Sequence, residues 1–185
     1  MSQSHQRRER ITAVLTTIRT LNASPMTRQR LELIKDAVVD LAGERSLFPL
    51  TDFPAPVAGY SVLYRLAQDP DDRLALYLQT GLAGNSTPPH NHGTWAVIAS
   101  IAGNEDNTLY ERLDAGDRDG VGSVKSAGRL VVKPGTAIAL MPTDIHSISL
   151  DDTQPAMHLH VYGKPIEKMT DRVWFDLARG TTAHF

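Results

Sequence analysis

The chain has 185 residues, enough for one domain or for one domain with an appendage. Its hydrophobic content of 41% and charged content of 22% are those of a folded protein, not of a disordered or fibrous one. The net charge of -2, from 19 basic and 21 acidic residues, gives no reason to expect nucleic acid or an anionic membrane as a partner. The chain contains no cysteine, which excludes disulfides and thiolate sites, so any metal must be held by nitrogen and oxygen.

The N-terminal sequence does not look like a targeting signal. Arg7, Arg8 and Arg10 are not followed by a signal-type apolar run, and no apolar stretch approaches the roughly eighteen residues of a membrane span. We therefore expect a cytoplasmic protein with no membrane contact.

Two helices are expected in the first 45 residues. Apolar residues recur there at three- and four-residue steps, which places them on one helical face. They are Ile11, Val14, Leu15, Ile18 and Leu21 in the first run and Leu31, Ile34, Val38 and Leu41 in the second. Ser24 with Pro25 predicts the start of the second helix and Gly43 its end. Residues 1–48 are thus predicted to be a helical segment that covers the rest of the protein.

Prolines and Gly59 interrupt regular structure after this segment, and short runs rich in branched and aromatic residues follow. We predict eight strands, near 61–68, 73–80, 94–101, 108–113, 129–132, 137–141, 146–150 and 157–162. The Gly- and Asp-rich stretch 114–128 is expected to be a loop. Short strands without intervening helices favour a sandwich or barrel over 49–185, whose last twenty residues should pack back on the core.

The clearest chemical signal is histidine, since five of the seven histidines lie between His90 and His160. His90 and His92 are two residues apart, so in extended chain both imidazoles point to the same side. His146 follows an apolar strand and a turn, and could complete a face of three nitrogens. A His-x-His pair alone fits a surface or core pair equally well.

The spacing around these histidines resembles the two motifs of the cupin family. The matching residues are Gly84, His90, His92 and Gly103 in the first motif and Pro142 and His146 in the second. Ala96 stands where many cupins have a glutamate ligand, and Asp144 replaces a usual glycine. The resemblance covers 60–163 and implies a mainly β fold, the cupin double-stranded β-helix or jelly-roll barrel, with the metal inside and with two N-terminal helices added here.

Three neutral imidazoles would leave a divalent ion with its full charge, because no carboxylate cancels part of it. Such a site favours anionic ligands, including a substrate thiolate. Imidazole ligands suit iron, zinc, copper or nickel, so ligand type alone does not choose the metal.

Further residues narrow the resemblance to the thiol dioxygenases, the family of cysteine dioxygenase and 3-mercaptopropionate dioxygenase. His158, His160 and Tyr162 alternate along one predicted strand and therefore share a face, although each also fits a role in the core. Arg65 lies on an early strand and could pair with a substrate carboxylate or simply be solvated.

The resemblance implies that His90, His92 and His146 hold ferrous iron, with zinc or nickel possible in the purified protein. It makes His160 and Tyr162 the pair that orders substrate and oxygen. Two departures are visible: His158 occupies the family's serine position, and a cysteine–tyrosine crosslink cannot form on Tyr162. Trp95 is bulky and close in sequence to His92, so it is either a substrate contact or a core residue.

The resulting hypothesis is an iron dioxygenase that converts a small carboxylated thiol, such as 3-mercaptopropionate or cysteine, to its sulfinic acid with O2. Alternatives remain at this stage: a three-histidine cupin that cleaves carbon–carbon bonds, a zinc hydrolase, or a non-catalytic cupin sensor of metal or ligand. The expected partners are the thiol and O2, and the expected assembly is a monomer or homodimer.

Overall fold

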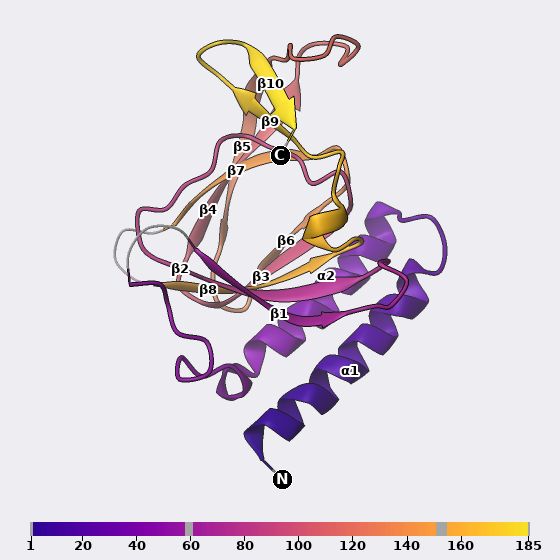
Figure 1. Cartoon of the computed structure of the whole chain (residues 1–185), viewed down its shortest axis with the longest axis vertical. Helices are drawn as coiled ribbons and strands as arrows, with labels where there is room; N and C mark the ends of the chain where they lie inside the picture. The colour runs from indigo at the N-terminus through magenta and orange to yellow at the C-terminus, as the bar shows by residue number, and fades with distance from the viewer. Residues whose placement is uncertain (1, 58–60, 151–154, 185) are drawn as a thin grey trace.

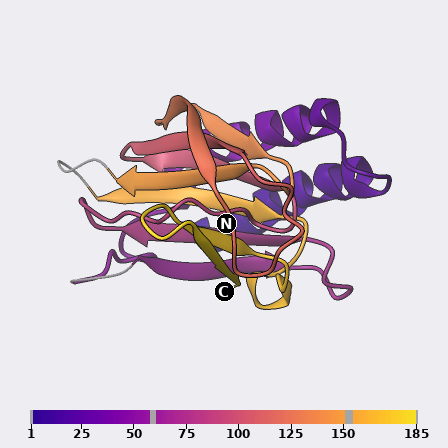
Figure 2. The same cartoon turned by 90° about the horizontal axis from the view of Figure 1, so that it is seen from above.

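The computed structural model describes residues 2–57, 61–150 and 155–184. Gly59, which the sequence places at the change of architecture, and residue 60, where the cupin resemblance begins, lie outside the described residues. Figure 1 shows two helices lying against one side of a β barrel, and Figure 2 shows the same layers from above. In the described part of the chain, no helix is long and apolar enough to cross a membrane.

The two predicted helices are present as α1 (Gln3–Asn22) and α2 (Arg28–Gly43). α2 does not begin at Ser24, because Thr27 caps it: the Thr27 side chain accepts a hydrogen bond from the Arg30 backbone N–H. Ile18 and Leu31 are both fully buried, as their periodicity predicts. Each side chain buried in this way contributes about 1.5–3 kcal/mol, so the helices are held by packing on the sheet.

All eight predicted strands are found, in two antiparallel sheets. Their bounds are β1 Val62–Gln68, β2 Ala75–Gly81, β3 Ala96–Ala102, β4 Glu105–Arg112, β5 Val124–Val132, β6 Ala137–Leu140, β7 Ile145–Leu150 and β8 Ala156–Tyr162. One sheet has the order β1-β2-β8-β3-β6, the other β5-β4-β7. Two 3-10 turns, Arg45–Leu47 and Ile166–Lys168, lie outside the sheets. The predicted fold class, a mainly β jelly-roll barrel with two N-terminal helices, is confirmed.

The five-stranded sheet buries both of its faces. Leu78 and Leu159 pack on the side of α1 and α2, in one apolar cluster. Tyr77, Ile98 and Tyr162 belong to a second cluster on the opposite side of that sheet, which also holds residues of the three-stranded sheet. The interior of the barrel is therefore this second face. His158 and His160 point to the same side as Tyr162, because residues two positions apart in a strand share a face.

The structure differs from the sequence prediction in three strands. β5 begins at Val124, inside the predicted loop, because exposed residues of that stretch pair with β4 as an edge strand. Residues 173–184 form an additional hairpin of β9 (Val173–Asp176) and β10 (Thr181–His184), drawn at the end of the barrel away from the helices (Figure 1). Buried Phe175 packs this hairpin onto the barrel, as expected for the segment.

Candidate metal centre

Two separate parts of the chain bring three histidines together inside the barrel. His90 and His92 lie on the connection between β2 and β3, and His146 lies on β7. The backbones of His90 and His146 are joined by two hydrogen bonds, in which His90 N–H donates to His146 O at 2.8 Å and His146 N–H donates to His90 O at 2.9 Å. This antiparallel bridge fixes the connection beside β7, so the positions of the side chains follow from the backbone.

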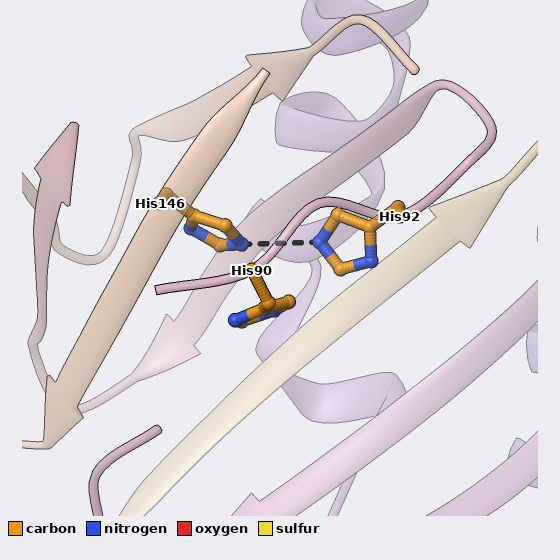
Figure 3. A group of neighbouring side chains, drawn as sticks. All are labelled: His90, His92 and His146. Atoms are coloured by element: carbon orange, nitrogen blue, oxygen red, sulfur yellow. Dashed lines mark hydrogen bonds between the residues drawn. The ribbon is translucent and has the colours of Figure 1, made fainter. Parts of the chain in front are cut away.

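The three imidazoles face one another (Figure 3). Their ring centroids are 4.6 to 5.2 Å apart, and a potential ligand nitrogen of each lies within 4.8 Å of the others. The Nε2 atoms of His92 and His146 are 3.0 Å apart. Two ligands about 2.1 Å from one ion at a right angle would have about this separation. All three rings are buried, so the group fits a divalent metal ion.

Hydrogen bonds hold two of these rings in the tautomer that a metal needs. His90 Nδ1 donates to the carbonyl oxygen of Pro88 at 2.9 Å, and His146 Nδ1 donates to the Asn107 side-chain oxygen at 2.7 Å. Each ring therefore leaves the lone pair of Nε2 toward the group. With His146 Nε2 unprotonated, His92 donates across the 3.0 Å contact from its own Nε2, and binding of an ion would move that proton to Nδ1.

Electrostatics also keep the histidines ready to bind a cation. Burial lowers the pKa of His90 to about 4, with a further lowering by the positive charge of Arg172. Burial, followed by the neighbouring histidines, lowers the pKa of His92 and His146 well below the usual value. At neutral pH all three rings are uncharged, so no protons have to be removed from imidazolium before an ion binds.

The three histidines line a cavity of about 520 Å³. His160 and Tyr162 line it too, which places this predicted pair beside the three-histidine group. His160 Nδ1 and the Tyr162 hydroxyl are hydrogen-bonded at 2.9 Å, and the rings of His92 and Tyr162 are 5.2 Å apart. Burial raises the pKa of Tyr162 far above its usual value, so its hydroxyl stays protonated at neutral pH.

The arginine of this cavity is Arg172, which the sequence analysis did not identify. Arg172 lies between the 3-10 turn Ile166–Lys168 and β9, and its charge lowers the pKa values of His90, His92 and His146. No sequence motif distinguishes it from the other basic residues, because its place in the cavity depends on how the C-terminal segment folds back.

The structure does not bring Arg65 or Trp95 to this cavity. Arg65 forms an ion pair with Glu167, and its side chain is half exposed on strand β1 at the edge of the sheet. Trp95 points into the cluster shared with the helices, and its indole N–H donates to the Asn22 side-chain oxygen at 3.0 Å. These positions do not match the expected substrate contacts: Arg65 has a partner outside the cavity, and Trp95 is a core residue.

His158 is buried inside the barrel, as its strand pattern predicts, but it is not among the cavity-lining residues. It lies against Glu105 of β4, with His158 Nδ1 and Glu105 Oε2 3.6 Å apart. Glu105 was also missed by sequence analysis, because no motif connects it with β8 and the contact runs between the two sheets. With His160, these residues form a second buried group of possible metal ligands.

No protein-family model matches the sequence, and no curated protein matches it. Solved structures similar to the chain include a cupin superfamily protein from Desulfitobacterium hafniense, with 15% identity over 64% of this chain and 90% of that chain at a TM-score of 0.47. A polyketide cyclase from Streptomyces resistomycificus has 25% identity over 59% of this chain and 68% of its own, with a TM-score of 0.41. An oxalate oxidase has 16% identity over 64% of this chain and 59% of its own, with a TM-score of 0.44.

Proposed function

We propose that the protein is an iron-dependent dioxygenase that oxidises a small carboxylated thiol to its sulfinic acid. The observation that carries this proposal is the combination of three buried, neutral histidines with Arg172 on the same cavity. A site of three imidazoles favours an anionic ligand such as a thiolate, and an arginine favours a carboxylate.

Arg172 takes the role of carboxylate partner that the thiol dioxygenase resemblance implies for Arg65. A guanidinium is permanently charged and can pair with both oxygens of a carboxylate. Arg172 lines the same cavity as His90, His92 and His146, so a carboxylate bound at Arg172 would hold a short thiol in the cavity that these histidines share. This holding converts an encounter in solution into a reaction between positioned groups.

Tyr162 and His160 supply a positioned proton. The hydroxyl of Tyr162 stays protonated, and a hydrogen bond in which His160 Nδ1 donates to the Tyr162 oxygen leaves the hydroxyl proton for a ligand in the cavity. We assign this pair to binding and orienting the thiol and the oxygen, with no redox role. His158 lies against Glu105 and contributes to the environment of His160, without direct contact with substrate.

The reaction balances without an added reductant. A thiol R–SH and O2 give R–SO2H, so both oxygen atoms end on sulfur and the sulfur supplies the electrons. Ferrous iron held by His90, His92 and His146 would supply the redox chemistry. The cavity of about 520 Å³ is larger than a three-carbon thiol requires, so longer carboxylated thiols belong among the substrates to test.

The test is oxygen consumption by protein loaded anaerobically with Fe²⁺, with the sulfinate identified by mass spectrometry. We expect turnover of 3-mercaptopropionate or cysteine and little turnover of cysteamine, which has the thiol but no carboxylate. Arg172→Gln should raise KM for the carboxylated thiol at least tenfold, since a charged hydrogen bond contributes about 1.5–3 kcal/mol.

Arg65→Gln is the matched control, because it removes the same charge outside the cavity and should leave KM unchanged. Full activity in His90→Ala would exclude the three-histidine group as the reaction centre. An absence of oxygen consumption with every thiol of the panel, in protein that retains its iron, would overturn the proposed function.

A further inference from the structure

A second set of metal-binding residues lies inside the barrel beside the first. Glu105 comes from β4 and His158 and His160 come from β8, so the group joins the two sheets. One potential ligand atom of each residue lies within 4.8 Å of those of the other two. The side chains are almost completely buried, at 0%, 1% and 3% exposed.

The polar atoms of this group are not satisfied by the described protein. Glu105 Oε1 accepts a hydrogen bond from the Asn107 side chain at 3.0 Å, and His160 Nδ1 is bonded to Tyr162. Glu105 Oε2 and the Nε2 atoms of His158 and His160 are buried and have no hydrogen-bond partner among the described residues. A buried polar atom without a hydrogen-bond partner is destabilising and rare in folded proteins, so three of them together point to a bound group.

A divalent cation satisfies all three atoms at once. A single proton shared by Glu105 and His158 would leave both Nε2 atoms without a partner. A cation takes a lone pair from each ligand, and the carboxylate cancels part of its charge. Two histidines and one carboxylate are a common ligand set for Fe²⁺ and Zn²⁺. The 3.6 Å between Glu105 Oε2 and His158 Nδ1 places the carboxylate beside the His158 ring.

We propose that Glu105, His158 and His160 bind a second divalent transition-metal ion, separate from the ion at His90, His92 and His146. The proposal does not depend on which reaction the first site catalyses. It also gives His158, which departs from the serine expected by the thiol dioxygenase resemblance, a role as a ligand.

The second ion would be connected to the first site by two routes. If His160 binds the ion through Nε2, its Nδ1 carries the proton and donates to the Tyr162 oxygen. The hydroxyl proton of Tyr162 is then left for a ligand in the cavity. The second route runs through Asn107, which donates to Glu105 Oε1 and accepts from His146 Nδ1.

The test is the number of ions bound by the full chain. Protein stripped with a chelator would be titrated with Co²⁺ in a calorimeter, and its metal content measured by mass spectrometry after gel filtration. We expect two Co²⁺ per chain in the unchanged protein and one in Glu105→Gln. Asp106→Asn is the matched control: Asp106 is the neighbouring acid, pairs with Arg129 on the surface, and its loss should leave two ions bound.

Other variants separate this proposal from the first site. His90→Ala should bind one ion per chain. The double variant with both His90→Ala and Glu105→Gln should bind none. His158→Gln tests the same site if Glu105→Gln does not fold. If only the first site fails to bind metal, His90→Ala should bind as many Co²⁺ ions per chain as the unchanged protein, and Glu105→Gln should bind fewer. One ion in the unchanged protein that is lost in His90→Ala and kept in Glu105→Gln and His158→Gln would overturn the second site.

Discussion

Burial decides the protonation state of the histidines in the barrel. It lowers the pKa of His158 to about 4 and that of His160 to about 3, and the three metal-site histidines are lowered as well. Burial has the opposite effect on an acid and raises the pKa of Glu105 to about 7. The lowered pKa values of the histidines and the raised pKa of Glu105 both favour the neutral form, because each ionised group is poorly solvated when buried. The interior is therefore rich in neutral lone pairs that a cation can use.

Asn107 orients His146, one of the candidate metal ligands, and its role can be tested alone. It is fully buried, and its side-chain oxygen accepts the His146 Nδ1 proton at 2.7 Å. Asn107→Ala should weaken metal binding at the first site about 10–100-fold, because the ring then loses the partner that holds its tautomer and orientation. Competition for Zn²⁺ with a chromophoric chelator measures this change.

Asn107→Asp keeps an oxygen facing His146 and should restore most of the affinity that Asn107→Ala loses. Ser147→Ala is a control for general disturbance of β7, since Ser147 is next to the ligand but bonds to the Tyr110 hydroxyl. Equal Zn²⁺ affinity in Asn107→Ala and the unchanged protein would show that Asn107 does not position His146.

At the scale of elements, β9 holds the connection that carries His90 and His92. Phe175 N–H donates to the Pro89 carbonyl oxygen at 2.8 Å, and Asn91 exchanges hydrogen bonds with Val173 at 2.9 and 3.0 Å. The C-terminal hairpin thus supports the candidate metal centre from outside, although none of the three candidate ligands lies on it.

Phe175 anchors this hairpin and is 1% exposed. Phe175→Ala should lower the free energy of unfolding by about 3–5 kcal/mol, because a large buried ring is replaced by a cavity. Urea unfolding followed by circular dichroism measures the loss. Leu177→Ala, on the same hairpin but 58% exposed, should change stability by no more than about 0.5 kcal/mol. Similar losses in both variants would mean that the hairpin is not anchored through Phe175.

The elements that sequence reasoning predicted are those with a local pattern. The helices follow from buried residues such as Ile18 and Leu31 at helical spacing, and β8 from its alternating residues. The sequence predicts a loop for part of β5, because Lys125 and its neighbours are exposed on an edge strand and show no alternation of burial. β9 and β10 have four residues each, too few for a periodic signal.

The same distinction applies to the candidate site. His90, His92 and His146 could be named because their spacing resembles a motif. Arg172 and Glu105 could not be named, because one reaches the cavity through the fold of the C-terminal segment and the other meets His158 across two sheets. A contact that forms only in the folded chain produces no motif of fixed residue spacing in the sequence.

At the scale of the whole molecule, the five-stranded sheet separates two different environments. Its outer face joins the helices in an apolar cluster, while its inner face carries apolar residues together with buried histidines. The helix side provides stability through burial, and the barrel side contains polar groups whose desolvation reduces stability. Occupation of the barrel by metal should therefore stabilise the whole fold, since the ion binds the folded state.

This arrangement predicts how the stability of the metal-free protein depends on pH. His90 and His158 have folded pKa values of about 4, below the 6.5 of the unfolded chain, so the unfolded state binds more protons between these values. Stability is fully present above pH 6.5 and falls as the pH is lowered toward 4, by about 3 kcal/mol for each histidine. Glu105 has the opposite sign: its folded pKa of about 7 exceeds its unfolded 4.5, so its contribution is lost as the pH rises through this range.

Because several histidines oppose one glutamate, the urea midpoint of the metal-free protein should fall between pH 7 and pH 5. Glu105→Gln should make this fall steeper and should raise the midpoint at pH 8, because the variant has no buried carboxylate to ionise. Bound Zn²⁺ should delay the fall to lower pH, since protons must then displace the ion from its ligands. A midpoint that is constant or rises from pH 7 to pH 5 in metal-free protein would contradict the idea that buried neutral histidines dominate its acid stability.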